Sequence, residues 1–298
     1  MTKIIIPDTI FGDPVDGAID RVLAGAQQNK PVIKPIINPI QIGQIDNPEN
    51  WIMLEEKTYE NYSYPDMLIN SARIAYNPTP EFQTASQKLG TLQNTSKDSL
   101  GRDFIGNINW EKAMKLNLLL GNKNIPPRMF IDFLSLLYEG VSSSKKVYNA
   151  SGKILDSKFC EQIYDDITKV QSPYRAEFLN ADFKYDKKKL YIEYEHKLDS
   201  SGNLIAGKRE ELSDWLDEDK IPGINLNSLF KTANKHGLPT NKTKLGDLHY
   251  YCPDKDNNSV SGFGAGSDWT SLYCGRGRSN ADSELGVRAC REATAGKI

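Results

Sequence analysis

The strongest pattern in this chain lies near its C-terminus and reads Gly262-Phe-Gly-Ala-Gly-Ser-Asp-Trp269-Thr-Ser-Leu-Tyr-Cys274-Gly-Arg-Gly-Arg278-Ser-Asn-Ala-Asp-Ser-Glu-Leu285-Gly-Val-Arg288-Ala-Cys290. Two apolar runs in it predict strands, one from Thr270 to Cys274 and one from Leu285 to Arg291. The residues between the two runs are mostly Gly, Arg, Ser, Asn and Asp. Because long polar segments inside compact domains tend to carry function, we expect an exposed functional segment held by a packed framework.

Three helices are predicted upstream of this stretch. The first begins after Asn109, a good N-cap residue, and stops at Gly121. The second starts at Pro127, a favoured first helical position, and ends at Gly140. The third runs from Asp156. Each carries an apolar stripe at helical spacing, which we expect to pack on a sheet.

From about residue 177 the apolar period changes from that of a helix to that of a strand. Leu190, Ile192 and Tyr194 alternate with more polar residues, as in a half-buried strand. The basic run from Lys187 to Lys189 precedes them and is interpreted as a solvated turn. A further strand is predicted from Leu248 to Cys252. Helices followed by a run of strands indicate an α+β fold.

Composition excludes several classes of protein. The chain has 298 residues, 39% of them hydrophobic, which is enough for a normal core. Its 37 Lys and Arg balance 39 Asp and Glu, so we expect no nucleic-acid partner. No apolar run approaches the roughly 18 residues of a membrane span, and the N-terminus lacks the apolar core of a classical signal peptide. We therefore expect a soluble chain without membrane insertion.

The N-terminal region differs in character from the rest of the chain. Prolines recur every four residues in Lys30-Pro-Val-Ile-Lys-Pro-Ile-Ile-Asn-Pro-Ile40, which predicts an extended arm over about residues 1–45. Its isoleucines need cover, either from its own globular domain or from another subunit, so the arm is a candidate for self-association. Residues 46–100 are turn-rich and predict little. We divide the chain into an arm and assembly region, 1–100, and a ligand-display domain, 101–298.

Catalytic patterns are scarce. His196, His236 and His249 form no metal-binding motif, and we interpret all three as structural. The glycine run 262–266 lacks the third glycine of a dinucleotide fingerprint and is interpreted as a tight loop. The acidic run 254–258 lacks the glycine and glutamate that a calcium loop requires. We expect no catalytic residue, no metal and no cofactor.

Four cysteines, Cys160, Cys252, Cys274 and Cys290, are too few for a disulfide scaffold and have no zinc-binding spacing. At most one disulfide is compatible with this number and spacing. The pair to test first is Cys274 with Cys290.

The terminal stretch resembles the end of the formylglycine-generating-enzyme branch of the C-type lectin fold. The similarity lies in the glycines before Trp269, the apolar strand after it and the closing Leu-Gly-Val-Arg288. Upstream, Trp110-x-x-Ala113 and Ile125-Pro-Pro-Arg-x-Phe130 are similar to the opening helices of that family. The resemblance covers about residues 101–298 and implies a C-type lectin-like domain there.

Two functions occur within that superfamily. Its enzymes hold copper with two cysteines five positions apart, and here Ser279 follows Cys274 at that distance. A site without the second thiolate lacks the soft ligand pair that copper needs, so the oxidase activity is not expected.

The other group comprises the variable proteins of diversity-generating retroelements, and the chain looks closest to their archaeal and archaeal-virus members. The segments 180–185, 189–196, 237–240 and 285–292 carry this similarity. In such proteins adenine-directed mutagenesis rewrites chosen codons of the terminal segment. The resemblance implies ten exchangeable ligand-binding positions here: Ser267, Asp268, Thr270, Ser271, Tyr273, Gly275, Arg276, Arg278, Asn280 and Asp282.

The framework between these positions is expected to be apolar and buried, formed by Trp269, Leu272, Leu285 and Val287. Tyr and Arg among small polar residues are typical of antibody-like binding surfaces. We therefore expect a non-enzymatic binding protein on a virion or cell surface, with an unidentified protein or glycan as its ligand. The alternative is a structural or interaction protein of the same fold whose terminal segment is an ordinary, undiversified loop.

Overall fold

The computed structural model describes residues 9–10, 13–14, 47–143, 145–243 and 245–293. It separates into two units, Met1–Gln41 and Ile42–Ile298. In the first, β1 (Thr9–Ile10) and β2 (Asp13–Pro14) form an antiparallel pair. The rest of the predicted N-terminal arm lies outside the described residues. Everything below concerns the second unit.

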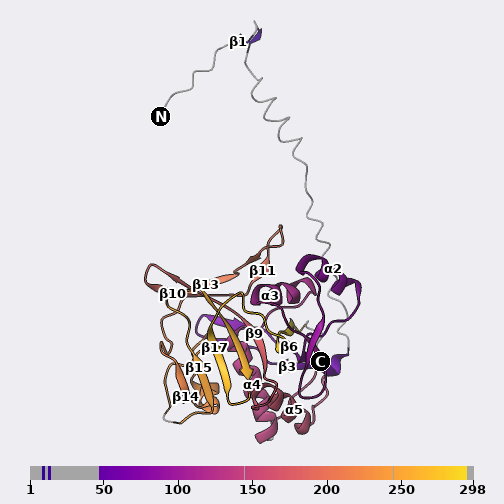
Figure 1. Ribbon diagram of the computed structural model, residues 1–298, viewed down its shortest axis with the longest axis vertical. Helices are drawn as coiled ribbons and strands as arrows, with labels where there is room; N and C mark the ends of the chain where they lie inside the picture. Colours follow the sequence, from indigo (N-terminus) through magenta and orange to yellow (C-terminus); the bar gives the residue numbers. More distant parts are fainter. Residues whose placement is uncertain (1–8, 11–12, 15–46, 144, 244, 294–298) are drawn as a thin grey trace. The chain divides into compact units, whose positions relative to one another are not determined.

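The fold is mixed α+β, as predicted, and is organised around one large sheet (Figure 1). The order of its main path is β13-β10-β9-β16-β17-β15-β14, and β18 pairs with β9 outside this path. The bounds are β9 (Arg175–Asp186), β10 (Lys189–Tyr194), β13 (Lys208–Glu211), β14 (Lys220–Ile224), β15 (Leu248–Tyr251), β16 (Ser259–Ala265), β17 (Thr270–Arg276) and β18 (Leu285–Gly286). The pairing of β15 with β17 is parallel, whereas β16 is antiparallel to both β9 and β17.

A three-stranded sheet, ordered β19-β6-β3, joins the two ends of this unit. It contains β3 (Trp51–Leu54), β6 (Met67–Arg73) and β19 (Arg288–Glu292). Because β6 pairs with both β3 and β19, residues 47–100 belong to the same compact unit as the terminal stretch. The structure therefore places the division of the chain near residue 42, where the sequence had suggested residue 100.

The three predicted helices are present. They are α3 (Trp110–Leu119), α4 (Pro127–Ser142) and α5 (Ser157–Thr168). Asn109 and Asp156 cap the first and third by accepting hydrogen bonds from backbone amides of their first turns. The second helix continues past Gly140 to Ser142. A Cβ atom at Gly140 would lie 2.7 Å from Cγ2 of Val147, so glycine is needed for close packing. Gly140 is therefore a close-packing residue and not a helix terminator.

The helices and sheets enclose one main core. Side chains of α4 and α5 pack with those of β9, β10, β15 and β17 and of β3 and β6. A second apolar cluster lies among α2 (Pro80–Leu89), α3, β8 (Asp103–Ile105) and β18. The remaining elements are the 3-10 helix η1 (Pro48–Asn50), β4 (Lys57–Tyr59), β5 (Tyr62–Tyr64), β7 (Asn94–Lys97), β11 (Lys197–Leu198), β12 (Leu204–Ile205) and α6 (Leu226–Thr232). Among the described residues no helix is long and apolar enough to cross a membrane.

The glycine run at 262–266 is not a tight loop, as its composition had suggested, but the greater part of β16 in the middle of the sheet. A Cβ atom at Gly264 would lie 2.6 Å from the Cβ of Ala176 on the neighbouring strand. The glycine is needed there because two strands approach closely, a reason for glycine in a strand that composition alone does not reveal. The run from Lys187 to Lys189 was predicted as a turn, which is correct for Lys187 and Lys188, both with positive φ, whereas Lys189 begins β10.

Candidate functional site

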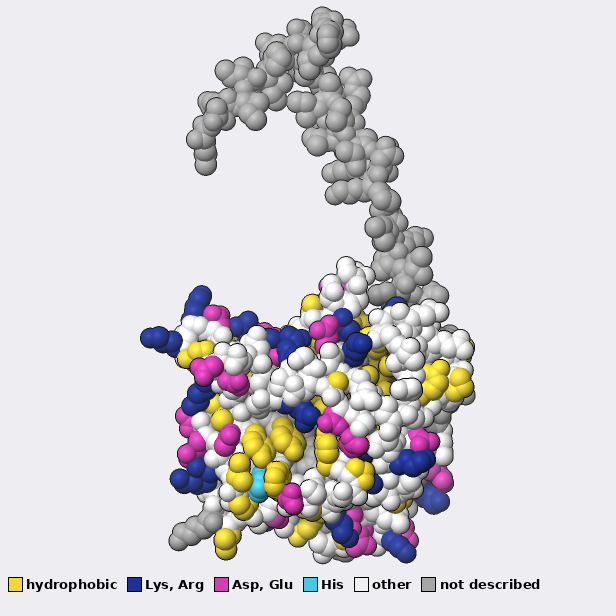
Figure 2. All heavy atoms as spheres, in the orientation of Figure 1, with side chains coloured by type: hydrophobic (Ala, Val, Ile, Leu, Met, Phe, Trp, Pro, Cys, Tyr) yellow, Lys and Arg dark blue, Asp and Glu magenta, His cyan; other side chains and the backbone are white. Residues whose placement is uncertain are grey.

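The candidate site lies on the outer face of the paired strands β15 and β17. Leu272 and Cys274 point from β17 into the main core, so the odd-numbered residues of that strand face the other way. The parallel register places Ser271 opposite His249 and Tyr273 opposite Tyr251. Figure 2 shows hydrophobic side chains gathered around a histidine over the region in which Figure 1 draws β14, β15 and β17.

Two ring stacks form this surface. The indole of Trp269 lies on the imidazole of His249, with ring centroids 5.0 Å apart and an interplanar angle of 16°. Tyr273 lies on Tyr251 at 5.3 Å and 10°. Stacked rings hold each other in place, so the surface is a preformed aromatic platform. Burial lowers the pKa of His249, which keeps its ring neutral at neutral pH.

A hollow of about 530 Å³ adjoins the tyrosine pair. Four of the ten predicted positions line it: Tyr273, Gly275, Arg276 and Asn280. The rest of the lining comes from acidic, basic and apolar residues outside the terminal segment: Asp217, Asp219, Tyr251, Cys252, Pro253, Asp254 and Lys255. The hollow thus combines aromatic faces with groups that donate and accept hydrogen bonds, as small-ligand sites do.

The charged groups of this hollow are held in place. Lys255 pairs with Asp217 at 3.0 Å, and Asp219 accepts a hydrogen bond from the backbone amide of Cys252 at 2.8 Å. The guanidinium of Arg276 lies 5.8 Å from the ring centroid of Tyr273. Asp254 accepts from the amide of Asp256 at 2.8 Å, so its carboxylate stabilises its own turn. The rim therefore presents both signs of charge.

Four other predicted positions do not line the hollow, and two of them are exposed while two are partly buried. Ser267 and Asp268 are exposed beside Trp269, and the serine hydroxyl donates to the aspartate. Arg278 turns away towards α3, where its guanidinium lies 5.1 Å from the ring centroid of Trp110. Asp282 is partly buried, and although burial opposes the effect, hydrogen bonds from neighbours including Tyr174 hold its pKa below the usual range.

Two of the ten positions are not on the surface. Thr270 is buried, and its hydroxyl donates to the carbonyl of Thr168 at the end of α5. Ser271 is fully buried between β15 and β16, opposite His249 and Gly264. The segment begins as a central strand, so side chains of the strands on both sides lie next to its own, and a short side chain can be covered by them whatever its polarity. Thr270 and Ser271 are therefore framework positions.

The predicted burial of Trp269 was wrong in the opposite direction. It was expected in the buried framework, but 39% of its surface is exposed. It precedes β17 on the outer face and covers His249 instead of entering the core. Leu272, Leu285 and Val287 are buried, as expected.

His249 and Tyr251 are the site residues that sequence reasoning missed. Both lie on β15, whose apolar character was recognised, and the alternation of Leu248 and Tyr250 with them was the available signal. That alternation shows which residues share a face but not which strand lies beside them. The parallel partner β17 follows about twenty residues later, after β16 has intervened.

The cysteines are all free, and no disulfide joins Cys274 to Cys290. Cys274 faces the core of the large sheet and contacts Ser261 at 3.8 Å, whereas Cys290 belongs to the small sheet and donates to the carbonyl of Lys123. Burial raises the pKa of both thiols. Ser279, five positions after Cys274, is exposed on the loop.

Comparison with known proteins adds no assignment. No family model, no curated protein and no solved structure matches this chain.

Proposed function

We propose that this chain is a non-enzymatic binding protein of the C-type lectin fold, formylglycine-generating type, whose terminal segment is an exchangeable ligand-binding surface diversified by a retroelement. The observation that carries the proposal is the separation of roles along one short segment. Leu272 and Cys274 fill the core, while Tyr273, Arg276 and Asn280 line one hollow beside them. Such a segment permits changes of surface chemistry at little cost to the core.

The exchangeable surface is narrower than the sequence implied. It contains Ser267, Asp268, Tyr273, Gly275, Arg276, Arg278, Asn280 and Asp282, supported by the fixed partners His249 and Tyr251. An aromatic platform beside paired charges suits a protein or a glycan ligand. Surface display, on a virion or a cell, is the setting in which a replaceable binding surface is useful.

The effect of substitutions on stability tests whether exposed and buried positions of the segment have separate roles. Tyrosine at Asp268 or Asn280 should change the free energy of unfolding by no more than about 0.5 kcal/mol, because both side chains are exposed. Ser271→Tyr should lower it by about 1–3 kcal/mol or more, because the serine is enclosed between strands. Urea unfolding of the three variants measures this difference. Equal effects at all three positions would remove the distinction between surface and framework.

Loss of binding tests the platform. The intact protein is screened against immobilised glycans and purified cell-surface proteins, and each ligand found is measured again with Tyr273→Ala. We expect affinity to fall at least about 30-fold, the effect of losing a central aromatic contact. Tyr148→Ala removes an exposed ring that does not line the hollow and should leave affinity unchanged. Ligands that bind both variants as well as the wild type would place the binding surface elsewhere.

The alternative is a structural or interaction protein of the same fold without diversification. The sequence of the neighbouring genome separates the two. A reverse transcriptase gene with a template repeat that differs from this segment at adenines supports diversification. A genome without them supports the alternative.

A further inference from the structure

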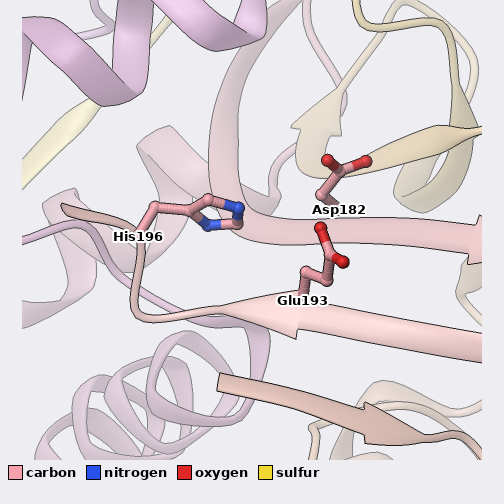
Figure 3. Close-up of side chains that lie close together, drawn as sticks. All are labelled: Asp182, Glu193 and His196. Carbon is pink, nitrogen blue, oxygen red and sulfur yellow. The ribbon is translucent and has the colours of Figure 1, made fainter. Parts of the chain in front are cut away.

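Three side chains with metal-binding groups meet at the β9–β10 hairpin, and none of them lines the hollow. They are Asp182 on β9, Glu193 on β10 and His196 just beyond β10, and their ligand atoms lie within 4.8 Å of one another. The two acidic residues are direct partners in the antiparallel register, which places their side chains on the same face. Figure 3 shows the nitrogen-bearing edge of the imidazole directed towards the two carboxylates.

The imidazole of His196 is held in an orientation suited to metal binding. Its Nδ1 lies 2.6 Å from the side-chain oxygen of Asn180, a buried residue of β9. Because that oxygen only accepts hydrogen bonds, Nδ1 carries the proton and Nε2 keeps a free lone pair. Trp110 contacts the ring edge-on at 5.0 Å. In most metal-binding histidines a hydrogen bond of this kind, made by the ring nitrogen that does not bind the metal, fixes the orientation of the ring.

Burial, followed by the positive charges of Arg278 and Lys184, lowers the pKa of His196 to about 4.

A second, independent observation that points to a bound cation is an unpartnered oxygen atom of Asp182. Its side chain is 2% exposed, and within the described part of the chain its Oδ1 atom has no hydrogen-bond partner. The other oxygen, Oδ2, is contacted by Lys184 at 2.9 Å and by Arg278 at 3.4 Å. A buried carboxylate oxygen without a partner is costly, and a cation bound at Oδ1 would remove that cost.

We propose that Asp182, Glu193 and His196 bind a divalent transition-metal ion, with Zn²⁺ as the best fit, and that Arg278 competes with the ion for Asp182. One imidazole and two carboxylates are ligands that zinc accepts, and three protein ligands leave one position open. Glu193 is only partly buried, and its Oε1 atom accepts a hydrogen bond from Arg209 at 3.3 Å.

Arg278 connects this site to the terminal segment. It is one of the ten predicted exchangeable positions, and its guanidinium contacts Asp182 while it covers Trp110. A smaller neutral residue at this position would remove a cation from the site and open the approach to it. The metal affinity would then depend on the residue present at position 278. This link rests on the proposed function, whereas metal binding itself does not.

Zinc binding to the full chain tests the proposal, measured by calorimetry, with Co²⁺ absorbance as a report of coordination. The wild type is expected to bind one Zn²⁺ at this site. Glu193→Gln should weaken that binding at least ~10-fold. Glu195→Gln is the matched control, because it removes the same charge two residues away from an exposed side chain outside the cluster, and it should bind as the wild type does. Arg278→Ser should strengthen binding by roughly 10-fold, since it removes the competing charge.

Both test positions are partly exposed, so the variants should fold, and their thermal unfolding checks this. Equal zinc affinity of Glu193→Gln and the wild type would overturn the site, as would failure of Arg278→Ser to bind zinc. A zinc affinity that Arg278→Ser leaves unchanged would overturn the competition. None of these outcomes involves the display ligand, so they are independent of the binding test above.

Discussion

A chain that begins at residue 101 is expected to lose cooperative unfolding, whereas a chain that begins at Ile42 should keep it. The shorter chain lacks β3 and β6, which leaves β19 without its strand partner. It also exposes core that Ile52, Leu54 and Ile69 cover. Circular dichroism during a urea titration measures the difference between the two chains.

The same truncation leaves a buried charge without most of its partners. Asp132 in α4 is 1% exposed and accepts hydrogen bonds from Lys57, Tyr59 and Tyr64 of the β4–β5 hairpin. Only Arg128, one turn before it, would remain. Removal of partners from a buried charge costs about 3–5 kcal/mol, a large part of the stability of a domain. Cooperative unfolding of the 101–298 chain at the same urea concentration would restore the division near residue 100.

Arg288→Met should lower the free energy of unfolding by about 3–5 kcal/mol, the cost of breaking a buried ion pair by removing one of its members. Its guanidinium is almost fully buried and donates to both carboxylate oxygens of Glu177, at 2.9 and 3.0 Å. A third hydrogen bond runs to the carbonyl of Asn70 on β6. Urea unfolding measures the loss. Lys153→Met, at an exposed ion pair, should change stability by less than about 0.5 kcal/mol.

Both members of the ion pair between Arg288 and Glu177 can also be replaced in one variant. Arg288→Met combined with Glu177→Gln should be less destabilising than the sum of the single changes, because no full charge of the pair stays buried. Arg73 and Asp166 complete the network, joined at 2.7 Å. Burial opposes ionisation of Asp166, but Arg73 and the amide of Ser99 outweigh it and keep the pKa of its carboxyl well below the usual range. Strict additivity of the two substitutions would show that the pair does not act as a unit.

This network of buried ion pairs explains why the Leu-Gly-Val-Arg motif ends in an arginine. The arginine is not a surface residue but the point at which β19, β9 and β6 are joined. Gly286 is enclosed as well, since a Cβ atom there would lie 3.0 Å from the ring of Phe104 and 3.1 Å from Arg73. Small and charged residues near the end of the chain can therefore belong to the buried framework, because residues distant in the sequence determine how deeply they are buried.

Local patterns in the sequence determined the secondary structure well where neighbouring residues were sufficient. The caps at Asn109 and Asp156 and the turn at Lys187 and Lys188 depend on hydrogen bonds or backbone angles within a few residues. The alternation in 190–194 likewise gave β10. The same local information predicted the α+β class and the position of the exposed loop after β17.

Only the tertiary structure decided which strands lie side by side, and most of the site depends on that. The pairing of β15 with β17 stacks Tyr251 on Tyr273, and it encloses Ser271, a residue as polar as the exposed Ser267. The pairing of β9 with β10 likewise places Asp182 opposite Glu193. A sequence shows which residues share a strand face, but burial is set by the neighbours on either side, and these come from distant parts of the chain.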